Sequence, residues 1–474
     1  MRSIEQHYIG GAFVASHGQE RFDLINPATE AVIGQVTLGD AEDARRAVAA
    51  AKAAFPAFSR TSKAERIALL RRIEVAVAAR VDELEAAMVE EYGAPVTWAG
   101  WAMRYSAESF GRMADTLEGY DFSRRIGTAE VVMTPVGVAA MITPWNSNVG
   151  FICGKLATAI AAGCTAVIKP SEMSALQTQV VLEALHEAGI PPGVFNLVNG
   201  RGDTVGAEFS AHRDVSKISF TGSTAVGKSI LRTGTDTLKR VTLELGGKSP
   251  TVILDDADLP SAMAIAVNAG FVNSGQACLA GTRILIPKQR MDEAIELAKS
   301  IVAGVKVGNP NDVATQIGPM VSRKQWQRVQ DYIRLGREEG ASVIVGGEGL
   351  PAHLDAGFFV RPTVFANVRN DMRIAQEEIF GPVLCLIGYD NEEDAIAIAN
   401  DTVYGLQAIV IGKDKKRARA VAERLDAGRV LVNGILHEPN APFGGFKQSG
   451  IGREFGVFGL EAYLEPKSLL GVVA

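Results

Sequence analysis

Three short stretches place side chains that can do chemistry among small or apolar neighbours. NSGQACLAGTR (273–283) holds Cys278, LELGGKSP (243–250) holds Glu244 at the end of an apolar strand, and ITPWNSN (142–148) holds Asn146 after another. A free thiol has a pKa of about 8.5 and is a poor nucleophile at neutral pH unless its thiolate is favoured, for example by backbone amides in a tight turn. A carboxylate in an apolar setting has a raised pKa, which suits a general base. An asparagine amide is a group that an oxyanion hole uses.

Each of these residues also has an interpretation without chemistry. Cys278 could be a small core residue, because free cysteines are among the most buried residue types. Glu244 could face water at an edge, and Asn146 could simply occupy a turn, where asparagine is common. The three residues alone leave both interpretations open.

A second set of motifs indicates phosphate binding. GSTAVGKS (222–229) fits the pattern G-x-x-x-x-G-K-[ST], and TVILDD (251–256) could be the strand and acid that hold magnesium in a P-loop NTPase. A strand, a glycine turn and a helix N-terminus make an anion site, whether the anion is a triphosphate or the pyrophosphate of a dinucleotide. NGRGDTVG (199–206) is one residue too long for the dinucleotide motif G-x-G-x-x-G.

Composition excludes several classes of function. The chain has 474 residues and a net charge of −6, which gives no sign of a surface for nucleic acid or an anionic membrane. The N-terminus lacks the apolar segment of a signal peptide, and no apolar run reaches the roughly 18 residues of a membrane helix. The six histidines include no closely spaced ligand pair, so no metal site is expected. The four cysteines, Cys153, Cys164, Cys278 and Cys385, include no C-x-x-C pair, which argues against a zinc ribbon or redox dithiol. Four cysteines in so long a chain do not make a disulfide scaffold, so a reducing cytoplasm is expected.

The segments that must position these residues change character along the chain. The first hundred or so residues have mostly helical patterns, whereas short β-branched runs alternate with helical segments after Val131. That alternation predicts a parallel sheet with crossover helices, and a second β/α series follows Cys278. We therefore expect two α/β lobes joined near residues 245–275. The apolar tail LEAYLEPKSLLGVVA predicts an edge strand or an oligomer contact.

Seven motifs together resemble one family, the aldehyde dehydrogenases: PWN, KPSE, FTGSTAVGK, LELGGKSP, GQACLAGTR, EEIFGPV and PFGGFKQSGIGRE. They occur in order and with the family's spacing, from roughly residue 8 to 470. This resemblance is more specific than one eight-letter motif, so we interpret FTGSTAVGK as the family's dinucleotide segment and its lysine as coincidental. The P-loop NTPase stays the alternative.

The resemblance implies an α/β fold with two Rossmann-type α/β domains and a small β oligomerisation element. The dinucleotide-binding domain would comprise residues 1–116 and 136–246, and the catalytic domain residues 247–443. The oligomerisation element would combine residues 117–135 and 455–474. Family members are dimers or tetramers, so a homodimer or homotetramer is expected.

The resemblance also implies oxidation of an aldehyde to a carboxylic acid with NAD, or with NADP as the alternative. Cys278 would attack the aldehyde, and the oxyanion would be held by Asn146 and the backbone N–H of Cys278. Glu244 would activate the water that hydrolyses the resulting thioester. Lys155 matches a family lysine that would assist proton movement, although an ordinary surface lysine is an equal interpretation.

The cofactor would be held by residues at the family's matching positions. Glu172 would accept hydrogen bonds from the adenosine ribose and repel a 2′-phosphate, which favours NAD. The expected cofactor-binding residues are Trp145, Lys169, Glu172, Phe220, Gly222, Ser223, Gly227, Glu378 and Phe380.

The substrate tunnel departs from the common family pattern. Ser147 and Asn148 stand where the family often has Phe-Pro, and Gly154 stands where some relatives have a bulky aromatic residue. With Phe151 these positions would line the tunnel, and the loss of bulk predicts a bulky aldehyde, aromatic or terpenoid. Two further rivals are a thiol hydrolase pairing Cys278 with His437 and a CoA-acylating relative, against which Glu244 argues.

Overall fold

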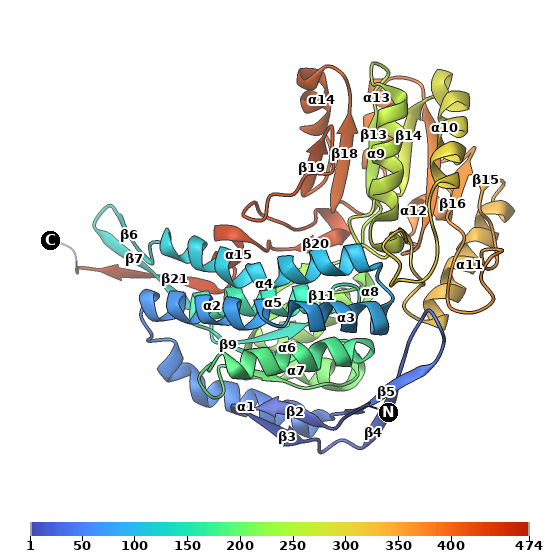
Figure 1. The fold of residues 1–474 in the computed structure, drawn as a ribbon. Coiled ribbons are helices and arrows are strands. Elements are labelled where there is room, and N and C mark those ends of the chain that lie inside the picture. Colours follow the sequence, from blue (N-terminus) through green and yellow to red (C-terminus); the bar gives the residue numbers. More distant parts are fainter. Residues whose placement is uncertain (1, 473–474) are drawn as a thin grey trace.

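A computed structural model describes residues 2–472, and its largest sheet has eight strands (Figure 1). The strand order is β20-β12-β11-β8-β9-β10-β2-β3, and the five strands from β12 to β10 are parallel. β20, β2 and β3 each pair antiparallel with a neighbour. The strands are β2 (Gln6–Ile9), β3 (Ala12–Ala15), β8 (Val138–Ile142), β9 (Thr165–Lys169), β10 (Phe195–Leu197), β11 (Val215–Thr221), β12 (Arg240–Glu244) and β20 (Gly450–Ile451).

The second large sheet has seven strands in the order β15-β16-β17-β14-β13-β18-β19. All neighbours are parallel except β15 and β16. The strands are β13 (Pro250–Ile253), β14 (Arg283–Pro287), β15 (Ser342–Val345), β16 (Thr363–Ala366), β17 (Val383–Tyr389), β18 (Gln407–Ile411) and β19 (Arg429–Val432).

Helices cover both faces of each large sheet, as the buried apolar clusters show. On the first sheet, α2–α6 and α15 pack on one face and α1, α7 and α8 on the other. On the second, α9 and α10 lie opposite α11–α14. The helices are α1 (Ala41–Phe58), α2 (Lys63–Ala78), α3 (Val81–Tyr92), α4 (Val96–Glu118), α5 (Asn148–Ala162), α6 (Ala175–Glu187), α7 (Ala207–Ala211), α8 (Thr224–Gly234), α9 (Leu259–Phe271), α10 (Met291–Ala303), α11 (Arg323–Glu338), α12 (Arg373–Gln376), α13 (Glu392–Asn400), α14 (Lys415–Ala422) and α15 (Gly456–Glu461).

Two three-stranded sheets complete the fold. One consists of β1 (Arg2–Ile4), β5 (Val32–Leu38) and β4 (Glu20–Ile25). The other joins β21 (Leu464–Leu470) to β7 (Ala129–Pro135) and β6 (Ser123–Ile126), and in Figure 1 it extends to one side, away from the seven-stranded sheet. β21 pairs antiparallel with β7 from Leu464 opposite Pro135 to Leu470 opposite Ala129.

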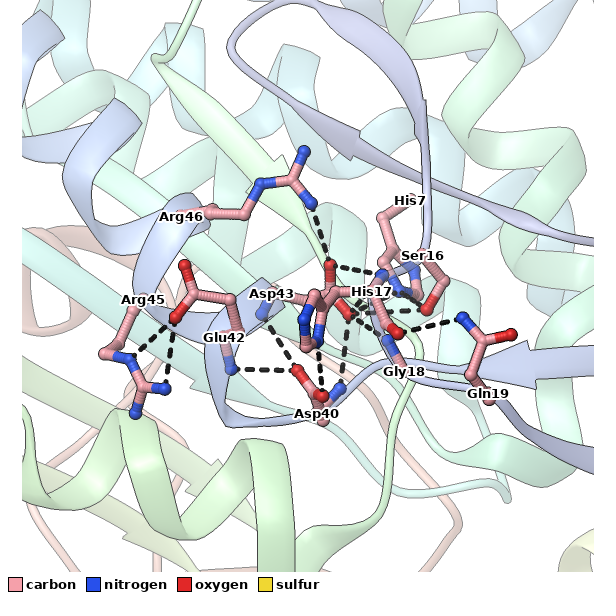
Figure 2. Close-up of polar contacts among 10 residues, drawn as sticks. All are labelled: His7, Ser16, His17, Gly18, Gln19, Asp40, Glu42, Asp43, Arg45 and Arg46. Carbon is pink, nitrogen blue, oxygen red and sulfur yellow. Dashed lines mark hydrogen bonds and ion pairs between the residues drawn. The ribbon is translucent and has the colours of Figure 1, made fainter.

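A buried aspartate fixes the start of α1 and the loop before β4 (Figure 2). The Asp40 side chain accepts the N–H of Glu42 and Asp43, which caps the helix. The fully buried Asp43 carboxylate accepts the backbone N–H groups of His17 and Gly18, each at 3.0 Å. These hydrogen bonds, together with its contacts to His7, hold the pKa of Asp43 well below its usual value despite burial.

The predicted α/β architecture agrees with the structure, with two corrections. Residues 2–38 contain five strands, which the helical interpretation of the N-terminal segment missed. The large sheets are mixed, since antiparallel strands occupy their edges. The domain boundaries stay predictions, and residues 1, 473 and 474 of the predicted domains lie outside the described residues. Within residues 2–472 no helix is long and apolar enough to cross a membrane.

Candidate active site

The loop that carries Cys278 lies between the two large sheets and has an unusual backbone. It follows a short 3-10 turn, η4 (Val272–Gly275), in which Asn273, Ser274 and Gly275 all have positive φ values of 50°, 59° and 74°. Non-glycine residues in this region are uncommon and cluster at functional sites. A Cβ on Gly275 would overlap the backbone of Gly381. The Cys278 loop is therefore pressed against the loop that contains Phe380.

The three stretches predicted to do chemistry converge on this loop. The carbonyl oxygen of Cys278 occupies the place where a Cβ on Gly247 would lie, so the segment after Glu244 contacts the Cys278 backbone. Asn146 Nδ2 donates to the carbonyl of Gln276 at 3.0 Å, and Asn273 Nδ2 donates to the carbonyl of Asn146 at 3.1 Å. The second amide N–H of Asn146 is left for another acceptor.

Glu244 is buried at the end of β12 and does not face water. Its side-chain oxygens make no hydrogen bond within residues 2–472. Burial, and then the charge of Glu454, raise the pKa of Glu244 well above its usual value, while Lys155 and Arg453 act in the opposite direction. The interpretation of Glu244 as a water-facing edge residue is wrong.

Cys278 is partly exposed, unlike the three other cysteines, which are buried. Burial of its sulfur, and then the carboxylates of Glu378 and Glu244, raise the pKa of the thiol to about 12. The backbone N–H groups of Cys278 and Leu279 lower the pKa, as expected from the tight loop, but they are outweighed. Burial and the two carboxylates therefore oppose the thiolate that these amides favour.

Lys155 is not a surface lysine. It is buried in α5, forms an ion pair with Glu454 and donates to Ser219 Oγ at 2.8 Å. Ser219 in turn contacts Glu454 at 3.2 Å. This cluster lies beside Glu244, because Ser219 is two residues from Thr221, the partner of Glu244 on β11.

Trp145, three residues after β8, packs against the loop that carries Glu378 and Phe380. The rings of Trp145 and Phe380 meet edge to face with centroids 5.3 Å apart. Glu378 Oε1 accepts the N–H of Gly247 at 3.0 Å, and burial raises the pKa of Glu378 to about 7. Phe380 has a positive φ of 62°, a second strained residue at this site.

Helix α11 holds the loop that carries Glu378 and Phe380. Arg328 donates to the carbonyls of Glu378 and Ile379, at 2.5 and 3.3 Å. Gln325 donates to the carbonyls of Ile379 and Phe380, at 3.1 and 2.8 Å. These four hydrogen bonds hold the strained loop in place.

The predicted phosphate segment lies where β11 meets α8. Ser223 caps α8, and its side chain accepts the N–H of Val226 at 3.4 Å. The remaining N–H groups of the first turn and the helix dipole make this end suited to an anion. Gly222 packs on the buried ring of Phe220, and Gly227 packs on Leu245.

This geometry excludes the P-loop interpretation. α8 begins at Thr224, so Lys228 lies in its second turn, where it donates to Gln448 Oε1 at 2.9 Å. The loop is too short to wrap a phosphate chain. TVILDD forms β13, which belongs to the other large sheet, so its acids are not beside this loop as a magnesium site would need.

Lys169 and Glu172 lie at the carboxyl end of β9, at the edge of the eight-stranded sheet where Ser223 also lies. Lys169 ends β9 and is buried, with its Nζ 3.6 Å from the Glu172 carboxylate. Glu172 also contacts Arg201, at 3.3 Å. A carboxylate for ribose hydroxyls, a helix N-terminus for pyrophosphate and an aromatic pair beside Cys278 fit a dinucleotide. No group of histidine, cysteine and acidic residues suited to a metal ion occurs in the part of the chain that the structure describes.

The structure places the predicted tunnel residues in different surroundings. Gly154 opens to space, because no heavy atom lies within 4 Å of the place of a Cβ, and Ser147 and Phe151 are partly exposed at the start of α5. Asn148 does not belong to this set. It is fully buried and bonds Thr143 at 3.1 Å and Thr178 at 2.9 Å.

Several residues of the site were missed by the sequence interpretation. Gln276, Arg201 and Glu454 all lie inside motifs that were noticed, but their contacts depend on distant segments. Gln325 and Arg328 left no signal, since they belong to an ordinary amphipathic helix. His437, the candidate partner for a hydrolase, instead hydrogen-bonds the Tyr105 hydroxyl at 2.7 Å.

Comparisons with known proteins agree with this geometry. The model of the aldehyde dehydrogenase family matches residues 13–469. A 3-succinoylsemialdehyde-pyridine dehydrogenase of a Pseudomonas species is 45% identical over 99% of both chains. A putative aldehyde dehydrogenase of Staphylococcus haemolyticus is 44% identical over the same share.

Solved structures give the same result. A mutant of aldehyde dehydrogenase C from Pseudomonas syringae, in complex with NAD+ and octanal, is 46% identical with a TM-score of 0.97, covering 98% of this chain and 96% of that one. Betaine aldehyde dehydrogenase from Staphylococcus aureus in complex with NAD+ is 37% identical with a TM-score of 0.95, covering 98% and 94%. The predicted fold class is confirmed, and the chain belongs to the aldehyde dehydrogenase family, a family of NAD(P)-dependent oxidoreductases.

Proposed function

We propose that the protein oxidises a bulky aldehyde to its carboxylic acid with NAD+, through an adduct on Cys278. The observation that carries this proposal is the convergence of three groups on one loop. Cys278 is partly exposed, Glu244 is buried without a partner among residues 2–472, and Asn146 is held by that loop. These are the nucleophile, base and oxyanion donor that an acyl transfer to water needs.

In the first step the Cys278 thiol loses its proton and Sγ bonds to the carbonyl carbon of the aldehyde. The product is a thiohemiacetal whose oxyanion accepts the free N–H of Asn146 and the backbone N–H of Cys278. Glu244 is the acceptor for the thiol proton, because its raised pKa brings it closer to that of the thiol.

NAD+, held by residues such as Trp145, Glu378 and Phe380, would supply a hydride acceptor. The hydride lost from the C–H bond of the thiohemiacetal would go to it, and a thioester would remain on Cys278.

Glu244 first gives up the proton it took from the thiol, and then takes a proton from water as the water oxygen attacks the thioester carbon. The C–S bond breaks, the carboxylic acid leaves, and the thiolate takes the proton from Glu244, which restores the thiol. Lys155, with Glu454 and Ser219, gives the Glu244 proton a route away from the site, which is supported by their mutual hydrogen bonds.

The bulky substrate is supported by an aromatic row on α4. Trp98, Trp101 and Tyr105 follow one another with ring centroids 5.0 and 5.3 Å apart, and His437 continues the row at 5.0 Å. Trp98 lines a hollow of about 340 Å³ together with Asn273, which bonds Asn146. Aromatic side chains next to a hollow that reaches Asn273 suit a ring-bearing or long apolar aldehyde.

The names of two relatives support the same substrate class. One relative is named for a pyridine-bearing semialdehyde, and another was solved with octanal. Gly154 contributes by leaving open space beside Lys155.

We also propose a homo-oligomer in a reducing, cytoplasmic compartment. The projecting β21–β7–β6 sheet exposes Ile126 and Leu470, which a second copy could cover. None of the four cysteines is in a disulfide. Whether a dimer or a tetramer forms would be read from the mass in light scattering.

The experiment compares acetaldehyde, octanal and benzaldehyde with NAD+, following reduced nicotinamide. The proposal expects a higher kcat/KM for benzaldehyde and octanal than for acetaldehyde, and no activity in Cys278→Ala. Gly154→Phe should lower kcat/KM for benzaldehyde more than for acetaldehyde. A preference for acetaldehyde would refute the bulky substrate, and activity retained in Cys278→Ala would refute the mechanism.

A further inference from the structure

A half-buried cation without a role in the proposed function lies where the aromatic row on α4 ends. Arg429 is the first residue of β19, and its Nη2 donates to the carbonyl of Leu436, directly before His437. The guanidinium forms no ion pair with a carboxylate in residues 2–472. A half-buried charge without a counter-charge is costly, so this guanidinium is suited to an anion that binds from solution.

The neighbouring groups hold the end of the row in place and leave Arg429 free. Arg112 pairs with Glu108 at 2.8 Å and donates to the carbonyl of Tyr105 at 2.7 Å. Its guanidinium also lies over the Tyr105 ring, 4.0 Å from the centroid. The Tyr105 hydroxyl bonds His437 Nε2 at 2.7 Å. Arg112 therefore already has its counter-charge, whereas Arg429 does not.

The charge at this end of the row is positive on balance. Burial, and then Arg429 and Arg112, lower the pKa of His437, whereas Glu438 raises it. Glu438 is exposed, so solvent screens its charge, and it accepts the N–H of Asn440 at 2.9 Å. An anion that reached Arg429 would therefore be attracted.

The aromatic row runs from a hollow beside the catalytic loop toward Arg429. Trp98, Trp101 and Tyr105 lie three and four residues apart on α4, so their side chains share one face of the helix. They span about 10 Å along the helix axis. Trp98 lines the same hollow as Asn273 of η4. Octanal has a comparable length when extended, so an aldehyde of that size bound at the catalytic cysteine would place its far end near Arg429.

We propose that Arg429 binds a carboxylate at the far end of the substrate, so that the enzyme oxidises long or ring-bearing aldehydes that carry an acid group opposite the aldehyde. One N–H of Nη2 stays on the Leu436 carbonyl, and the remaining N–H groups of the guanidinium are the donors for the carboxylate. The inference rests on the proposed function, because it needs an aldehyde that is oxidised at Cys278, and it narrows the bulky substrate to an anionic one.

The test compares octanal with 8-oxooctanoate, which has the same chain and a carboxylate at its far end, using purified protein and NAD+. The native protein should have the higher kcat/KM for 8-oxooctanoate. The difference should lie mainly in KM, because a contact far from the reacting carbon is the same in the ground state and the transition state. The methyl ester of 8-oxooctanoate lacks the charge and should lose the preference.

Arg429→Gln removes the charge but keeps a donor for the Leu436 carbonyl. It should lower kcat/KM for 8-oxooctanoate at least about tenfold more than kcat/KM for octanal, as expected for a lost charge-assisted contact, and Arg429→Lys should restore part of the loss. Arg419→Gln is the matched control, because Arg419 pairs with Glu423 on the surface of α14, and it should leave the preference unchanged.

Two kinds of failure can be told apart. A native preference for octanal, a methyl ester used as well as the acid, or equal losses for both substrates in Arg429→Gln would overturn the role of Arg429, while oxidation of octanal still supports the proposed function. Oxidation of neither aldehyde would overturn the proposed function and the inference with it.

Discussion

Lys155 and Glu454 offer a test of the electrostatics around the base. Glu454 raises and Lys155 lowers the pKa of Glu244, so in the native ion pair their effects largely cancel. Removing one partner leaves the other uncompensated. Lys155→Met should therefore raise the pKa of Glu244, and Glu454→Gln should lower it.

The size of the shift follows from the sheet. Lys155 donates to Ser219, which lies two residues along β11 from the partner of Glu244, and two residues of a strand span about 7 Å. At an effective dielectric constant of about 20, a unit charge at roughly that distance contributes about 2 kcal/mol, which changes the protonation equilibrium of Glu244 by more than about tenfold. Glu244 acts as a base only when deprotonated, so activity is lost as the pH falls through its pKa.

The assay is the pH dependence of thioester hydrolysis, measured as turnover of an activated ester on Cys278 without NAD+. The acid limb should move to higher pH in Lys155→Met and to lower pH in Glu454→Gln. The double variant should return close to the native profile, because both charges are gone. Shifts of the same sign in both single variants, or a double variant that adds them, would refute the reasoning.

Two further predictions concern the oxyanion donor Asn146 and the buried Arg283. Asn146→Ala should lower kcat by about 10²–10³-fold, the usual loss for one oxyanion donor, with a smaller change in KM. Steady-state kinetics measure this loss, and an unchanged melting temperature shows that the variant is folded. A change confined to KM would contradict the role of Asn146. The fully buried Arg283 donates to the carbonyls of Lys248, Ile398 and Ala399. Arg283→Met should therefore lower the free energy of unfolding, measured by urea denaturation, by about 3 kcal/mol. An unchanged free energy of unfolding would contradict the structural importance of Arg283.

The sequence was most informative where chemistry depends on neighbours within one segment. β8 is a buried, continuous apolar run, and β11 and β12 are mostly buried strands beside it, so the residues at their carboxyl ends lie at the same sheet edge. The sequence placed Asn146 and Glu244 each at the end of a strand and Ser223 in a turn before a helix, and the strand order in the structure brings all three to that edge. The short strands before residue 38 were missed because they are half exposed and carry few consecutive apolar residues.

Other features depend on contacts that no local pattern encodes. The buried Lys155 is paired with Glu454, almost three hundred residues away in the sequence. The pKa of Cys278 is raised first by burial and then by the carboxylates of Glu378 and Glu244, which come from distant segments. Asn148 was expected beside the substrate, but the side chain turns toward Thr143 and Thr178 in the core. Arg201 was visible only as part of a glycine-rich turn until β4 brought Glu20 against it.

The central claim, an acyl intermediate on Cys278 that Glu244 hydrolyses, is tested most directly by mass spectrometry of Glu244→Gln. After incubation with NAD+ and octanal, the account predicts a protein mass increased by one acyl group and a modified peptide containing Cys278. The claim is contradicted if the protein stays unmodified although it has reduced NAD+ through several turnovers. It is also contradicted if the acyl group is on another residue.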